Sequence, residues 1–122
     1  FPIEFEDCPL VIESIYHLSE LPKGFEMLET GTTDFSIYTA YINSETKQTI
    51  TFHQSVKTSF KPHYNTEDYN LEEISIDKHI GIGLEGKESY MAAWDNGDYI
   101  LEISADLSKS EVINLAKSAK IL

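Results

Sequence analysis

The strongest constraint on the fold lies in the last third of the chain, where two runs of strand-forming residues flank a tight turn. The runs are 90–94 and 99–103, and Asn96-Gly97 lies between them. Asn-Gly is the preferred centre of a type I′ hairpin turn, because both central residues need positive φ and these two residues tolerate it best. Aromatic and β-branched residues in the runs are typical of strands. The pattern predicts a β-hairpin over residues 90–103.

The sequence after this hairpin predicts a helix over residues 108–122. Ser108 and Glu111 have the spacing of a capping box. An apolar stripe with the period of a helix follows: Val112, Leu115, Ala116 and Ala119. Lys117 and Lys120 lie in the expected last turn, where the helix dipole favours cations. Because so short a helix is marginal alone in water, we expect its stripe to dock on the strands upstream.

The preceding two thirds of the chain predict further short strands. Residues 49–56 alternate between apolar and polar side chains, which indicates a half-buried antiparallel strand. Residues 35–43 have apolar side chains on both faces, which indicates a strand that is central or buried on both sides. The other expected strands are 14–18 (with a helical turn as the alternative), 25–29, 72–76 and 80–84, and turns are expected at 30–33, 43–46 and 85–88.

Together these elements predict one α+β domain over residues 1–122, with residues 1–14 as an N-terminal extension. We expect a curved antiparallel sheet of about six to eight short strands in meander order, packed on one C-terminal helix. Gly81 and Gly83 lie inside one strand, where glycine often marks a bend or the close approach of another backbone. We therefore expect the sheet to curve over the helix at this point.

Four stretches resemble the domain-of-unknown-function 4367 family, and the resemblance covers roughly residues 15–122. They are Trp94-Asp-Asn-Gly-Asp-Tyr99, Ser104-Ala-Asp-Leu-Ser-Lys-Ser-Glu111 with the following helix, Leu21-Pro22-Lys23-Gly24-Phe25, and Ile50-Thr-Phe-His-Gln54. Residues 57–70 are longer and more aromatic than this family pattern. The resemblance implies an extracytoplasmic domain of Gram-positive bacterial proteins that are membrane-anchored or lipoproteins. The family has no established chemistry, so the resemblance implies fold and location but no mechanism.

The net charge of the chain excludes some classes of binding partner. The formal net charge is −12, and all nine basic residues are lysines. Phosphate backbones are bound through Lys and Arg, so we expect no nucleic-acid partner and no direct binding to anionic membranes. No apolar run approaches the length of a membrane span, and the chain begins at Phe1. We therefore interpret it as a mature or excised piece of an anchored protein.

The candidate catalytic and metal-binding residues have simpler interpretations. Four carboxylates lie near the last predicted hairpin: Asp95, Asp98, Glu102 and Asp106. Paired carboxylates can hydrolyse glycosides, but turn chemistry already explains the Asp-Asn-Gly-Asp run. His53, His63 and Asp68 are too loosely spaced for known metal-ligand patterns. Cys8 has His17 nearby in sequence, but acidic surroundings make a thiol less reactive. We expect no catalytic residues, no metal and no cofactor.

The predicted binding surface is the long loop expected over residues 57–70, which carries several aromatic side chains. Its candidate residues are Phe60, His63, Tyr64 and Tyr69. Long loops are often functional, and exposed aromatic residues anchor protein or glycan partners. We interpret Trp94 as a core residue beneath the helix. The predicted function is a non-catalytic extracytoplasmic module for sensing or protein interaction, whose partner is an envelope protein or a glycan. The alternatives are a carrier of an apolar ligand between sheet and helix and, less strongly supported, a carboxylate-dependent hydrolase.

Overall fold

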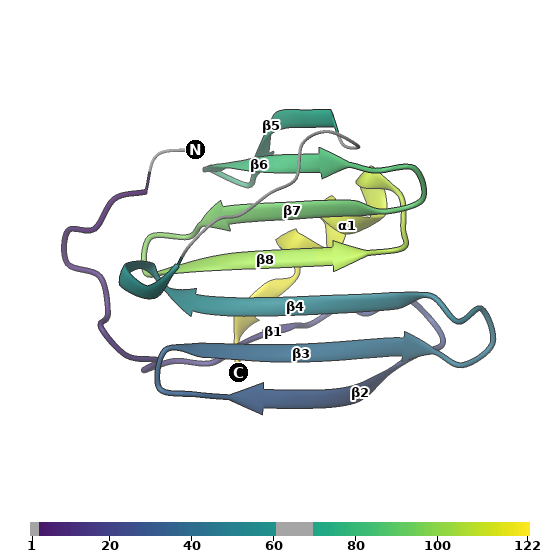
Figure 1. Cartoon of the computed structure of the whole chain (residues 1–122), viewed down its shortest axis with the longest axis horizontal. Helices are drawn as coiled ribbons and strands as arrows, with labels where there is room; N and C mark the ends of the chain where they lie inside the picture. Colours follow the sequence, from purple (N-terminus) through teal and green to yellow (C-terminus); the bar gives the residue numbers. More distant parts are fainter. Residues whose placement is uncertain (1–2, 61–69) are drawn as a thin grey trace.

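A computed structural model of the chain describes residues 3–60 and 70–122. Most of the described chain is β-strand, with a short 3-10 helix and an α-helix (Figure 1). In chain order the elements are β1 (Tyr16–Leu18), β2 (Phe25–Thr32), β3 (Ser36–Asn43), β4 (Thr49–Val56), η1 (Lys57–Ser59), β5 (Asn70–Ile76), β6 (His79–Glu85), β7 (Tyr90–Asp95), β8 (Tyr99–Ala105), α1 (Lys109–Lys117) and β9 (Ala119–Ile121).

Seven of these strands form an antiparallel sheet in the order β2-β3-β4-β8-β7-β6-β5. The sheet consists of two meanders, β2–β4 and β5–β8, rather than the single meander expected from the sequence. They join because β8 pairs with β4, from Ile50 opposite Ala105 to Val56 opposite Tyr99. The expected α+β architecture of an antiparallel sheet with one C-terminal helix is confirmed.

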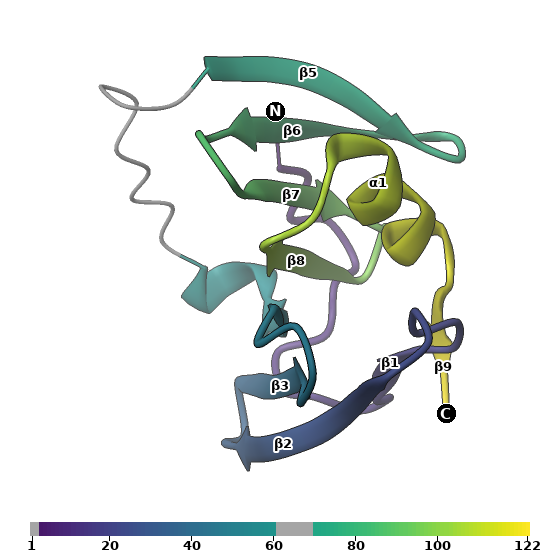
Figure 2. The same ribbon diagram turned by 90° about the vertical axis from the view of Figure 1, so that its right-hand side faces the viewer.

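The helix α1 covers one face of the sheet, where it contacts β5, β7 and β8 (Figure 2). Its capping box forms as predicted, since the Ser108 hydroxyl accepts from the Glu111 N–H and the Glu111 carboxylate accepts from the Ser108 N–H. Its apolar stripe is buried in the core, which also contains Trp94, as predicted. The buried residues of the helix are Val112, Leu115 and Ala116.

The prediction that the helix continues to Leu122 is wrong. The helix ends at Lys117, and Ala119–Ile121 form β9, which pairs with β1 in a separate two-stranded sheet. The Leu122 N–H donates to the Ile15 carbonyl across this pairing. Local helix periodicity could not reveal β9, because the partner of its main chain lies about a hundred residues away in sequence.

The predicted turn at residues 30–33 is also wrong, because β2 continues to Thr32. An irregularity in the pairing between Met27 and Glu29 marks a β-bulge that re-aims the strand. Gly31 lies within the strand opposite Tyr38. The sequence Thr-Gly-Thr-Thr favours a turn locally, but pairing with β3 stabilises the extended backbone instead.

The hairpin between β7 and β8 forms, but not with the predicted type I′ turn. Gly97 has a φ of 106°, whereas Asn96 is not among the described residues with positive φ. The Asn96 side-chain oxygen instead accepts from the N–H groups of Asp98 and Tyr99. The Asp95 carboxylate accepts from the Gly97 N–H. Side-chain acceptors therefore hold the turn in a different backbone conformation.

Candidate functional site: a polar groove at one end of the sheet

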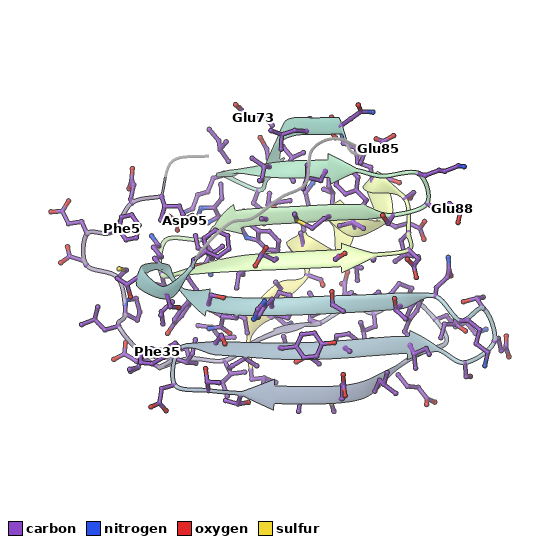
Figure 3. All side chains as sticks on the ribbon, in the orientation of Figure 1. Phe5, Phe35, Glu73, Glu85, Glu88 and Asp95 are labelled. Carbon is purple, nitrogen blue, oxygen red and sulfur yellow. The ribbon has the colours of Figure 1, made fainter. Side chains whose placement is uncertain are left out.

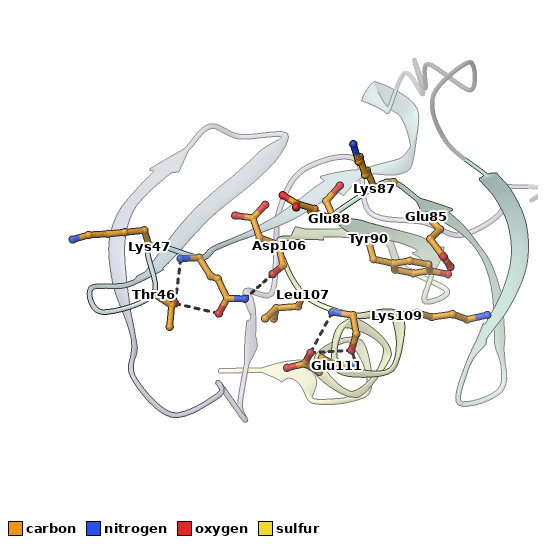
Figure 4. Close-up of a pocket in the computed structure, with 14 residues that line it drawn as sticks. Thr46, Lys47, Glu85, Lys87, Glu88, Tyr90, Asp106, Leu107, Lys109 and Glu111 are labelled. Carbon is orange, nitrogen blue, oxygen red and sulfur yellow. Dashed lines mark hydrogen bonds between the residues drawn. The ribbon is translucent and has the colours of Figure 1, made fainter.

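A groove of about 790 Å³ lies where three connections meet at one end of the sheet (Figure 4). The connections are the β3–β4 loop, the β6–β7 turn and the segment that leads from β8 into α1. Adjacent antiparallel strands alternate in direction, so connections that are distant in sequence emerge at the same end of the sheet. Loops on a rigid sheet are a common place for binding residues.

Hydrogen bonds across the groove hold two of its walls together. The Gln48 side-chain amide donates to the Asp106 carbonyl over 2.9 Å. The Asp106 carboxylate accepts from the Thr49 N–H at 3.2 Å and from the Thr49 hydroxyl at 3.1 Å. The β3–β4 loop is therefore tied to the start of the connection that leads to α1. The capping box at Ser108 orders the next residues of this wall.

A hydrogen-bonded cluster lies beneath the groove. The Tyr90 hydroxyl donates to Glu72 Oε1 over 2.7 Å, and Lys109 Nζ lies 2.8 Å from the same oxygen. Hydrogen bonds from Lys109 and then Tyr90 lower the pKa of the Glu72 carboxyl below its ordinary value. Burial and the neighbouring Glu72 carboxylate raise the pKa of Tyr90 far above its ordinary value. The tyrosine therefore stays a neutral donor at physiological pH.

Both signs of charge line the groove. The charged residues are Lys47, Glu85, Lys87, Glu88, Asp106, Lys109 and Glu111. Such a lining is suited to a polar partner that carries both amino and acidic groups, because each can find a counter-charge. Within the residues that the structure describes, no group of three or more His, Cys, Asp or Glu side chains could hold a metal ion. The groove therefore offers charged and hydrogen-bonding side chains of both signs.

The sequence was compared with known families, curated proteins and solved structures. A family model described as a domain of unknown function, DUF4367, matches residues 15–118. The chain belongs to this family. The comparisons with curated proteins and with solved structures gave no match. The matched part of the DUF4367 domain runs from β1 to the end of α1 and contains every residue of the groove.

The four carboxylates from which a hydrolytic pair could be drawn do not lie together in the DUF4367 domain. Asp95 is ion-paired with Lys57 at 2.8 Å, and Asp98 lies in the β7–β8 turn. Glu102 lies in the middle of β8, 3.9 Å from the His53 ring. Asp106 follows the opposite end of β8 and is hydrogen-bonded to Thr49. Three of the four therefore have structural partners that explain their positions.

Most of the predicted binding residues lie outside the described part of the DUF4367 domain. Phe60 follows η1 and is half-buried, whereas His63, Tyr64 and Tyr69 fall in residues 61–69. Two of the three candidate metal ligands, His63 and Asp68, also lie outside the described residues. The third member of that set, His53, packs edge-on against the Tyr38 ring, with ring centroids 6.2 Å apart. No described contact brings these residues together.

The groove residues were missed in the sequence, where residues 43–46 and 85–88 were interpreted only as turns. A usable signal was present, because the turn at 85–88 and the helix cap carry charged residues of both signs, and Lys47 follows the turn at 43–46. The missing information was the strand order, which places these segments at the same end of the sheet.

Among the described helices of the DUF4367 domain, none has the length and apolar character needed to cross a membrane.

Proposed function

We propose that this DUF4367 domain is a non-catalytic extracytoplasmic module that senses or binds an envelope protein or a glycan. The observation that carries the proposal is the groove, which gathers three lysines and four carboxylates from separate loops around one depression. The extracytoplasmic location, in a membrane-anchored protein or lipoprotein, is part of the proposal and follows the expectation attached to the family resemblance.

The packing between helix and sheet favours binding at the surface over transport of an apolar ligand inside. Val112 and Ile103 are fully buried, and Leu115 is only 2% exposed. These side chains fill the space that an apolar ligand would need, since protein interiors pack as densely as organic crystals. The close packing at these positions gives the carrier hypothesis no support.

The placement of the carboxylates likewise favours recognition over hydrolysis. A glycosidase needs two carboxyl groups that flank one bond, with one of them kept protonated by its surroundings. Asp95 already neutralises Lys57, and Asp106 already accepts two hydrogen bonds from Thr49. Both carboxylates are therefore engaged by structural partners, Asp106 as part of the groove wall.

An NMR titration of the ¹⁵N-labelled chain tests the proposal. The probe is a soluble cell-wall glycan fragment that carries both amino and carboxylate groups. We expect saturable shifts of the amides of Gly86, Ser89 and Leu107, which line the groove. The Lys87→Glu variant reverses one groove charge, and we expect it to weaken binding several-fold.

Lys117→Glu is the matched control, because Lys117 is exposed on the last turn of α1 and is not among the groove-lining residues. This variant changes the net charge by the same amount, so it should leave the affinity nearly unchanged. Equal losses in both variants would show a general charge effect and would contradict binding in the groove. Release of new reducing ends from the fragment would show catalysis and would overturn the non-catalytic assignment.

A further inference from the structure

The N-terminal segment 3–14, named here the strap, lies across the strand ends opposite the groove. Figure 3 shows Phe5 of the strap and Asp95 at one end of the sheet, with Glu85 and Glu88 at the other. The strap has no helix or strand, and none of its residues is fully buried. Phe5 and Leu10 are 55% and 68% exposed. The strap also precedes the part of the chain that matches the family model.

A buried ion pair holds the first part of the strap. Lys57 Nζ lies 2.8 Å from Asp95 Oδ1, and the lysine side chain is only 2% exposed. The same ammonium donates to the Glu4 carbonyl over 2.6 Å. The Glu4 N–H in turn donates to Asp95 Oδ2 over 3.4 Å. The ion pair is therefore hydrogen-bonded to both the N–H and the carbonyl of one strap residue.

Two further buried side chains hold the other end of the strap. The Tyr99 hydroxyl accepts from the N–H groups of Glu13 at 3.0 Å and Ser14 at 3.3 Å. The Gln54 amide donates to the Ser14 carbonyl at 2.8 Å and accepts from the Tyr16 N–H at 2.9 Å. Gln54 is 1% exposed and Tyr99 is 2% exposed. These side chains are thus built into the domain and directed at the main chain of the strap.

The strap is held mainly through its main chain rather than through its side chains. Each hydrogen bond described between the strap and the rest of the protein uses a main-chain atom of the strap. Ile12 adds an apolar contact, since it is partly buried and packs against the core. Recognition of a peptide mainly through its main-chain N–H and carbonyl groups is a recurring mode of peptide binding.

The ion pair makes release of the strap easier than release of a core strand. Burial of two charges carries a large desolvation penalty. The Glu4 main chain lies against this pair, so release of the strap exposes that side of the pair to water and lowers the penalty. The strap also buries little apolar surface, which is characteristic of segments that open locally while the core stays folded.

We infer that Gln54, Lys57, Asp95 and Tyr99 form a binding site for the main chain of a peptide, and that the strap is its exchangeable resident occupant. The preferred peptide has a branched apolar residue where Ile12 lies. This site goes beyond the proposed function, because it is a separate site at the other end of the sheet from the groove.

Binding of a strap peptide to the full chain tests the inference. The probe is a fluorescein-labelled peptide of residues 3–15 with a C-terminal amide, which supplies an N–H where Tyr16 has its own. The receptor is the full chain with Ile12→Gly, which weakens the resident strap and leaves all four site residues intact. We expect saturable binding by fluorescence polarisation, at least ten-fold tighter than to the wild type. In the wild type the strap competes at an effective concentration on the order of millimolar.

Leu10→Gly is the matched control, because Leu10 belongs to the same segment but is 68% exposed. It should bind the peptide no better than the wild type, and a scrambled peptide should bind neither variant. Equal affinity of the Ile12→Gly and Leu10→Gly chains for the peptide would overturn the inference. Loss of amide protection throughout β4 and β8 in Ile12→Gly would overturn it as well, since the strap would then be part of the core.

Discussion

Gly83 shows how one absent side chain shapes the region beneath the groove. It lies in β6 opposite Glu72 of β5 on one side and Ala92 of β7 on the other. A Cβ at this position would overlap the Tyr90 hydroxyl. Glycine therefore lets the Tyr90 ring cross β6 and reach Glu72. The glycine thus makes room for a side chain rather than for another backbone.

Replacement of Gly83 by alanine should destabilise the protein, because the rigid Tyr90 ring must move or lose its hydrogen bond to Glu72. We expect a loss of about 1–3 kcal/mol in the free energy of unfolding, measured by urea denaturation. Gly31→Ala is the control, since a Cβ there meets nothing within 4 Å and the residue also lies in a strand. It should change stability by less than about 1 kcal/mol, in the stabilising direction. Similar losses in both variants would contradict this explanation.

At the scale of elements, the helix is joined to the sheet by charge as well as by apolar packing. Lys109 in the first turn of α1 reaches Glu72 of β5, and Tyr90 of β7 donates to the same carboxylate. One carboxylate thus connects three elements that are far apart in the sequence. Because Glu72 and Lys109 are 36% and 45% exposed, solvent screening keeps the contribution of their ion pair small.

This connection should make stability depend on pH below the ordinary pKa of a glutamate. The pKa of Glu72 is lowered in the folded protein, so its contribution is complete above the unfolded pKa of 4.5 and is lost as the pH falls through the folded value. Lys109→Met should cost less than about 1 kcal/mol at pH 7, and the difference from wild type should shrink at pH 3. Urea denaturation at both pH values measures this.

Lys117→Met is a suitable control, because it removes the same charge from the last turn of the helix. Its difference from wild type should not shrink between pH 7 and pH 3 in the same way. A Lys109→Met effect that is equal at the two pH values would indicate lost packing of the lysine stem instead of a lost ion pair.

At the scale of the whole molecule, the pairing of β4 with β8 unites the two meanders into one sheet. The paired residues are about fifty positions apart in sequence, from Ile50 with Ala105 to Val56 with Tyr99. Phe52 lies opposite Ile103 at the centre of this pairing, and both belong to the core. Such distant contacts carry a large loop-closure cost before they form, so they favour slow and cooperative folding.

Ile103→Ala should therefore weaken both meanders together. Ile103 is fully buried, and its truncation should cost about 2–5 kcal/mol in the free energy of unfolding. We expect native-state hydrogen exchange to show the same loss for slowly exchanging amides of β3 and of β7. A loss confined to β7 would contradict a single cooperative unit.

Sequence patterns were most informative where neighbouring residues determine the structure. The capping box at Ser108, the alternation in 49–56 and the glycines in β6 all correspond to the observed elements. Each of these signals comes from backbone or side-chain preferences that act within a few residues. Of the predicted binding residues, only Phe60 is described, and the groove was not predicted at all.

The sequence by itself determined the α+β class, the existence of most strands and the start of the helix, because local hydrogen bonds and periodic burial decide these features. Only the tertiary structure decided that β8 pairs with β4, that residues 119–121 form a strand with β1, and that three loops meet at one groove. The physical reason is that these features depend on main-chain and side-chain partners separated by tens of residues. The energy of such contacts appears only when the whole chain is assembled.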